Sequence, residues 1–194
     1  MSRRRASIPA RYFEKLYAAN PDPWSFRNSD YEREKYAQTL AALPHSRYAA
    51  AFEAGCSLGI LTRALAPRCD SLLAVDAAEQ PLAAARARCA DYPQVRIERR
   101  RIPAEWPSGD FDLILLSEVL YYFDRADLAA VCSSLRQTLA PAGDVVLVHW
   151  IGETDYPLSG DDAVDGFIAG VLDIVRVLRR ERHDRYRLDV LRRQ

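Results

Sequence analysis

The sequence lacks the features that mark membrane, secreted and nucleic-acid-binding proteins. No apolar run approaches the roughly 18 residues of a membrane span. The charged N-terminus has no apolar segment behind it, as a secretory signal requires. Lys+Arg and Asp+Glu each total 27, so the chain has no excess of basic residues for a nucleic acid. We therefore expect a cytoplasmic protein with neither a membrane nor a nucleic acid as partner.

Cysteine is sparse and unpatterned. The four cysteines, Cys56, Cys69, Cys89 and Cys132, follow no metal-ligand spacing. We expect free thiols that act as small core residues, and no metal site. The basic run that starts at Ser2 and ends at Arg5 is expected to be a solvated terminal tail.

What is present is an alternation of helical and strand patterns over 194 residues, enough for one domain. Asp30 is a candidate cap for the second helix. Helices are expected at 8–20, 31–43, 58–66, 79–90, 125–140 and 161–173, and strands at 49–53, 71–75, 94–99, 111–116, 145–148, 174–182 and 185–193. The turn Pro141–Ala142–Gly143 is expected just before the fifth strand.

The strand pattern predicts an α/β fold. Residues 111–116 form a continuous apolar run, which is typical of a central parallel strand buried on both faces. Residues 174–193 read as two strands around a His183–Asp184 turn. The expected architecture is a mostly parallel sheet that ends in an antiparallel hairpin.

A glycine-poor loop follows the first strand. It reads Glu53-Ala54-Gly55-Cys56-Ser57-Leu58-Gly59, and the next strand ends in Asp76. This is a nucleoside-binding βαβ pattern in which Ser57 replaces the second glycine of a dinucleotide loop. Ser57 is tolerable there if its φ is negative.

The acid Glu53 favours one cofactor over another. A carboxylate repels the phosphates of NAD but attracts the ammonium and sulfonium of S-adenosylmethionine (SAM), which has no phosphate. Asp76 is placed to accept hydrogen bonds from both ribose hydroxyls. The sequence therefore predicts a SAM site, with S-adenosylhomocysteine (SAH) as the product.

With these motifs the chain resembles class I SAM-dependent methyltransferases, and within them the nodulation protein S family. The resemblance includes Val75-Asp76, residues 111–114 and residues 139–144. The closer likeness lies in Asp22-Pro23-Trp24, Tyr31-Glu32 with Lys35-Tyr36, and residues 118–122. It implies a Rossmann-like, seven-stranded sheet of order 3-2-1-4-5-7-6 in a single domain, 1–194, with residues 1–45 as a helical cap over the cofactor.

The resemblance also implies the site. Residues expected at the cofactor are Trp24, Tyr36, Glu53, Ala54, Gly55, Gly59, Asp76, Ala77, Ile102 and Ser117. Arg101 stands where the family often has an acid near adenine, so either the backbone of Ile102 or the stacked guanidinium of Arg101 is expected to recognise the ring there. The sequence does not specify the ligand of the methionine carboxylate, for which Arg27, Tyr31 and Lys35 could each supply a donor. Trp24 either shields the cofactor or anchors its segment.

Acceptor chemistry is expected at the ends of the fourth and fifth strands. Catalytic candidates are Glu118, which can orient or deprotonate an amine, together with Tyr121 and His149. Tyr122, Trp150, Tyr156 and Asp161 are further candidates for the acceptor pocket. Glu118 and His149 also have plain structural readings, as a helix-start acid and a hydrogen-bonded core histidine.

The expected reaction is methyl transfer to an N or O atom of a small molecule, with an amino sugar or oligosaccharide among the acceptors as in nodulation protein S. An NAD(P)-dependent oxidoreductase and a non-catalytic binding module of the same fold remain open. The sequence specifies no oligomeric state.

Overall fold

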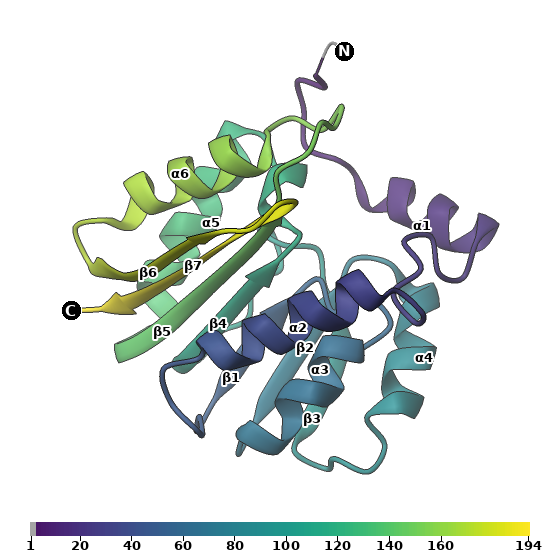
Figure 1. Cartoon of the computed structure of the whole chain (residues 1–194), viewed down its shortest axis with the longest axis horizontal. Coiled ribbons are helices and arrows are strands. Elements are labelled where there is room, and N and C mark those ends of the chain that lie inside the picture. Colours follow the sequence, from purple (N-terminus) through teal and green to yellow (C-terminus); the bar gives the residue numbers. More distant parts are fainter. Residues whose placement is uncertain (1–2) are drawn as a thin grey trace. The chain divides into compact units, whose positions relative to one another are not determined.

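The computed structural model, whose helices and strands are labelled in Figure 1, describes residues 3–194. The chain divides into two compact units. The N-terminal unit is Pro9–Arg101. The C-terminal unit is Ile102–Gln194 together with the first residues of the chain up to Ile8. Each unit contributes part of the strand series and has buried apolar residues of its own.

The N-terminal unit contains three parallel strands and four α-helices. Its elements are α1 (Ala10–Ala19), α2 (Asp30–Ala42), β1 (Ala51–Ala54), α3 (Ile60–Leu65), η1 (Ala66–Arg68), β2 (Leu72–Asp76), α4 (Glu79–Arg88) and β3 (Val95–Arg99). β2 lies between β1 and β3. All four residues of β1 are buried, as are the first four of β2, so these two strands contribute buried core residues.

The second helix and its cap each begin one residue earlier than predicted. Ser29, not Asp30, is the N-cap: its hydroxyl accepts a hydrogen bond from the Glu32 N–H at 3.2 Å. Asp30 is the first helical residue. The reason is that a Ser side chain reaches the third helical amide from the cap position, and the pattern Ser29-x-x-Glu32 supplies that spacing.

The C-terminal unit contains the second half of the strands and two α-helices. Its elements are β4 (Phe111–Ser117), η2 (Leu120–Tyr122), α5 (Arg125–Thr138), β5 (Leu139–Trp150), α6 (Gly160–Val171), β6 (Val175–Arg182) and β7 (Tyr186–Arg193). β5 runs parallel to β4 and antiparallel to β7, and β6 pairs antiparallel with β7. The predicted hairpin is confirmed, and the strand order is the predicted β3-β2-β1-β4-β5-β7-β6.

The turn predicted before the fifth strand is wrong. Residues 141–143 lie inside β5, which starts at Leu139. Leu139 pairs with Phe111 and Asp144 with Leu113, so a register shift absorbs the extra residues. Ala142 takes a left-handed φ of 59° there. A bulge inside a strand carries the same Pro and Gly residues as a turn, and local pattern does not separate the two.

The predicted solvated tail is confirmed in that Arg3 and Arg4 are exposed, but both are held by partners. Within the C-terminal unit, Arg4 donates to Asp155 through its backbone N–H and its Nε, each at 3.0 Å. Arg3 donates to the Tyr156 carbonyl at 3.3 Å. Arg5 is exposed, as expected, while Ser2 lies outside the described residues. Acidic and carbonyl partners about 150 residues away in the sequence hold this segment.

The remaining composition-based expectations concern thiols, metals and membranes. The four cysteines are buried with free thiols. Within residues 3–194, no cluster of His, Cys, Asp and Glu side chains is placed to hold a metal ion. The helices of the same residues are too short or too polar to cross a membrane.

Candidate cofactor and acceptor sites

The loop after β1 depends on left-handed backbone at three positions. Gly55 and Gly59 have φ of 80° and 71°, which glycine adopts without steric cost. Gly59 also lies against α4, since a Cβ added there would stand 2.8 Å from the Cβ of Ala85. Gly59 therefore sets how closely the start of α3 approaches α4, a packing role that a cofactor-binding assignment does not require.

From the sequence we expect a negative φ at Ser57, and the structure does not have one. The φ of Ser57 is +49°. Two hydrogen bonds hold this residue in the left-handed region. Its N–H donates to Asp76 Oδ2 at 2.9 Å, and its Oγ shares a 2.5 Å hydrogen bond with the Tyr17 hydroxyl of α1. Such contacts compensate the roughly 1 kcal/mol that a non-glycine residue loses in this conformation.

Asp76 is the last residue of β2, and two backbone amides hold its carboxylate. Oδ2 accepts from Ser57 and Oδ1 accepts from Ala78, each at 2.9 Å. Burial raises the pKa of Asp76, and these amides oppose the rise. The side chain is partly exposed, and each carboxylate oxygen has a further lone pair. The amides thus fix the orientation of an acceptor that can still bind hydroxyl groups.

Glu53 lies near the end of β1 and is 2% exposed. Its Oε2 is fully buried and accepts no hydrogen bond from any residue in 3–194. Burial, with a contribution from the negative charge of Asp76, raises the pKa of Glu53 to about 7. A buried carboxylate oxygen without a donor is costly, and a cation or an N–H group of a ligand would satisfy it.

The predicted aromatic residues of the cap lie in the same unit. Trp24 meets Tyr17 edge-on at 5.7 Å between ring centroids and stacks on Phe26 at 5.5 Å. This arrangement supports the anchoring reading of Trp24. Tyr36 is partly buried on α2. Lys35, a candidate for the methionine carboxylate, is 2% exposed and donates to Glu32 at 2.9 Å.

Ala54 and Ala77, the two alanines predicted at the cofactor, differ in exposure. Ala54 is buried at the end of β1, and Ala77 is partly exposed directly after β2. Ile102 and Ser117 lie instead in the C-terminal unit, where both are partly exposed. The N-terminal unit therefore carries eight of the ten predicted cofactor residues: Trp24, Tyr36, Glu53, Ala54, Gly55, Gly59, Asp76 and Ala77.

The predicted acceptor residues cluster in the C-terminal unit. Glu118 follows β4 directly, with a left-handed φ of 57°. Its Oε2 accepts from the Tyr121 hydroxyl and from the Trp150 N–H, each at 2.8 Å. Burial, and next the charge of Glu118, raise the pKa of Tyr121 well above its ordinary value, so this phenol remains a donor. Glu118 is thus a carboxylate held in a strained, defined orientation.

Three tyrosines lie together beside this carboxylate, and Tyr121 contacts it. Tyr121 and Tyr122 meet edge-on at 4.7 Å, and Tyr156 stacks on Tyr121 at 5.4 Å with 19° between the planes. We call Tyr121, Tyr122 and Tyr156 the tyrosine cluster. Aromatic faces beside a carboxylate suit a cationic or sugar-like ligand.

His149 is fully buried in β5, and its Nε2 accepts a hydrogen bond from the Leu120 N–H at 3.1 Å. That nitrogen is therefore engaged with backbone. A catalytic role for His149 stays a prediction, and this geometry favours the structural reading.

Sequence reasoning missed Tyr17, Arg3 and Arg4. The partner of Tyr17 lies 40 residues away and those of Arg3 and Arg4 about 150. No periodicity or spacing signals such contacts. The one signal in the sequence was Ser57 itself, which replaces a loop glycine and therefore needs a partner that stabilises its backbone conformation.

The family of the chain follows from its similarity to known proteins. The family model for nodulation protein S matches residues 11–151, a span that includes α1, the glycine loop, Asp76 and the Glu118 region. The chain belongs to the nodulation protein S family. The predicted resemblance is confirmed.

Two curated members give the extent of the likeness. Nodulation protein S of Bradyrhizobium diazoefficiens is 35% identical over 122 residues, which are 62% of this chain and 58% of that protein. Nodulation protein S of Rhizobium tropici is 32% identical over 130 residues, 66% of this chain and 55% of that protein. The matches thus span little more than half the length of these curated relatives.

Solved structures confirm the fold that the family implies. A Pseudomonas syringae protein provisionally described as a methyltransferase is 40% identical, covers 84% of this chain and 99% of its own, and has a TM-score of 0.73. The N-methyltransferase NodS of Bradyrhizobium japonicum WM9, solved with SAH, is 22% identical, covers 96% and 99%, and has a TM-score of 0.80. The predicted class I methyltransferase fold is confirmed.

Proposed function

We propose that this protein is a SAM-dependent methyltransferase that acts in the cytoplasm on a small molecule. The observation that carries the proposal is the buried Glu53 oxygen, which has no donor among residues 3–194, beside the amide-held carboxylate of Asp76. A cationic nucleoside without phosphate matches both groups. The nodulation protein S relatives and the SAH-bound NodS structure support it.

The acceptor atom in this proposal is an amine nitrogen, with an amino sugar as the acceptor class. Glu118 supports the choice, because an oriented carboxylate both attracts an ammonium group and accepts its proton. The tyrosine cluster supplies aromatic faces for a cation or for the apolar face of a sugar ring. A hydroxyl acceptor would need a base but carries no positive charge, so the attraction between the Glu118 carboxylate and a cation would have no role.

When bound, SAM supplies a sulfonium-activated methyl group and leaves as SAH. The protein's own residues do the rest. Asp76 and Glu53 bind the nucleoside and its positive charge. Glu118 would accept the proton of the acceptor's ammonium form, which leaves the nitrogen lone pair free to take up the methyl group. Tyr121 and the Trp150 amide orient the Glu118 carboxylate for this step.

We further propose that, of the predicted cap of residues 1–45, the part in the N-terminal unit, residues 9–45, covers the cofactor within one functional domain. The support lies inside the N-terminal unit, where Tyr17 of α1 reaches Ser57 in the glycine loop and Trp24 packs on Tyr17. Burial, then the charge of Asp76, raise the pKa of Tyr17, which is therefore a neutral hydrogen-bonding group.

Calorimetric titration with SAM, SAH and NADH tests the cofactor. We expect binding of SAM and SAH and none of NADH; the reverse would favour the oxidoreductase. Release of SAH in the presence of glucosamine oligomers and a panel of hydroxyl acceptors then tests the reaction. SAM binding without turnover on any acceptor would favour the non-catalytic module.

A further inference from the structure

The segment between β5 and α6 brings Tyr156 into the tyrosine cluster. Residues 151–159 have no helix or strand of their own. Tyr156 nevertheless stacks on Tyr121 and meets Tyr122 edge-on at 4.7 Å. Since this backbone has no regular hydrogen-bond ladder, the position of Tyr156 depends on what else holds the segment.

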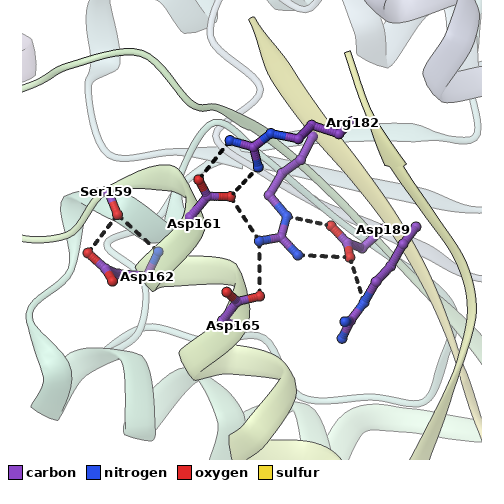
Figure 2. A network of polar contacts seen from close by, with 8 residues as sticks. Ser159, Asp161, Asp162, Asp165, Arg182 and Asp189 are labelled. Atoms are coloured by element: carbon purple, nitrogen blue, oxygen red, sulfur yellow. Dashed lines mark hydrogen bonds and ion pairs between the residues drawn. The ribbon is translucent and has the colours of Figure 1, made fainter. Parts of the chain in front are cut away.

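The far end of the segment is fixed to the hairpin by an ion network. Figure 2 shows Asp161 and Asp165 on α6 facing Arg182 and Asp189 on the hairpin. Between them Arg187, which is 8% exposed, donates to Asp161 at 3.1 Å, to Asp165 at 2.9 Å and to both oxygens of Asp189. This end is anchored whatever happens to the middle of the segment.

The N-terminal arm, which we define as residues 3–8, holds the middle together with Leu158, whose N–H donates to the Tyr121 carbonyl at 3.4 Å. Arg4 binds Asp155 through its backbone N–H and its guanidinium, and Arg3 donates to the Tyr156 carbonyl. The other end of the arm is fixed beside the same cluster, where the Ile8 N–H donates to the Tyr122 carbonyl at 2.8 Å. The arm therefore ties both sides of the cluster together.

We infer that Arg4 is a positioning residue for the methyl acceptor, an inference that rests on the proposed function. Arg4 holds Asp155, and Asp155 is the direct neighbour of Tyr156. Tyr156 supports the ring of Tyr121, whose hydroxyl orients Glu118. Arg4 touches neither substrate nor cofactor in this scheme, and it acts through the segment that it restrains.

The first experiment measures the restraint itself. Hydrogen–deuterium exchange is followed in the full-length wild type and in Arg4→Ala, with Arg5→Ala as the matched control. Arg5 is exposed and makes no hydrogen bond or ion pair among residues 3–194. We expect faster exchange in residues 151–159 in Arg4→Ala alone. Unchanged exchange there overturns the inference.

The second experiment separates positioning from general stability. SAH release is measured with a glucosamine tetramer as acceptor, and SAM affinity by calorimetry. We expect kcat/KM for the acceptor to fall about two- to fivefold in Arg4→Ala, the range of an exposed ion pair, with an unchanged Kd for SAM. Asp155→Ala should behave alike, and the double variant should lose no more than either single variant.

The outcomes distinguish this inference from the proposed function. Faster exchange with unchanged acceptor kinetics overturns the positioning role and leaves the methyltransferase proposal standing. A wild type that binds no SAM and methylates no acceptor overturns the proposed function, while the exchange measurement still decides whether Arg4 holds the segment.

Discussion

At the scale of the residue, Glu53 connects stability to cofactor binding. Its pKa of about 7 means that the folded protein keeps a proton that the unfolded chain releases at lower pH. The contribution of this group to the free energy of unfolding therefore falls as pH rises from about 4.5 to about 7. A bound cation reverses the penalty, because it favours the ionised form.

Glu53→Gln should stabilise the unliganded protein at high pH and weaken SAM binding. The gain over wild type should be up to about 3 kcal/mol larger at about pH 8 than at about pH 5. SAM affinity should fall by about 1–3 kcal/mol and lose its dependence on pH near 7. Denaturant unfolding and calorimetry at several pH values measure both effects.

The control for this variant is Glu79→Gln, since Glu79 lies exposed on α4 and pairs with Arg86 at the surface. It should change neither quantity. An equal gain in stability at both pH values would contradict the raised pKa of Glu53.

Glu118→Gln should lower kcat far more than it lowers SAM affinity. The amide oxygen still accepts from Tyr121 and Trp150, but it cannot take a proton from an amine. Loss of a general base costs roughly 10²- to 10⁴-fold in rate. SAH release and calorimetric SAM titration give the two numbers.

Glu153→Gln is the matched control, an exposed glutamate on the segment after β5. It should turn over like wild type. Normal turnover in Glu118→Gln would assign Glu118 a structural role at its strained position.

At the scale of the element, the approach of α3 to α4 depends on one missing side chain. Gly59→Ala places a Cβ 2.8 Å from the Ala85 Cβ and 2.9 Å from the Ala85 Cα, at a φ of 71°. Overpacking and the left-handed backbone together should destabilise the protein by about 2–4 kcal/mol. Denaturant midpoints measure the loss.

A second change tests the cause. Ala85→Gly added to Gly59→Ala should return part of the lost stability, whereas exposed Ala83→Gly on the same helix should not. If both additions behave alike, contact with Ala85 is not what requires glycine.

The hairpin and α6 are joined through Arg187. Arg187→Ala leaves Asp189, which is 1% exposed, without its bidentate partner. Asp189 then keeps its 3.4 Å ion pair with the exposed Arg180, so the loss should lie below the roughly 3–5 kcal/mol of a fully unpaired buried charge. Arg176→Ala, on the exposed side of β6, should lie within about 0.5 kcal/mol of wild type.

Thermal and denaturant unfolding measure these variants. Asp189→Ala in the Arg187→Ala background should recover stability, because it removes the stranded charge. A double variant less stable than the single variant would show that the network acts by packing rather than by charge.

At the scale of the whole molecule, the positions of the strands were predictable because each strand has its own hydrophobic pattern. The apolar run of β4 and the alternation in β7 are local signals, and the family resemblance supplied their order. The start of β5 was not predictable, since its bulge uses the residues of a turn. The same holds for the site. Glu53 and Asp76 were predictable because they lie at the ends of predicted strands, whereas the hydrogen-bond partners of Ser57 and Glu118 were not predictable.

The sequence by itself determined the elements, the glycine loop, the two acids at neighbouring strand ends and the family. Each of these features depends on residues that are close together in the chain, so spacing and side-chain chemistry are enough to predict it. Only the tertiary structure decided that Ser57 is left-handed and held by Tyr17, that backbone engages His149, and that Arg4 restrains Asp155. The physical reason is that these contacts join residues far apart in the chain, and folding alone brings such partners within hydrogen-bonding distance.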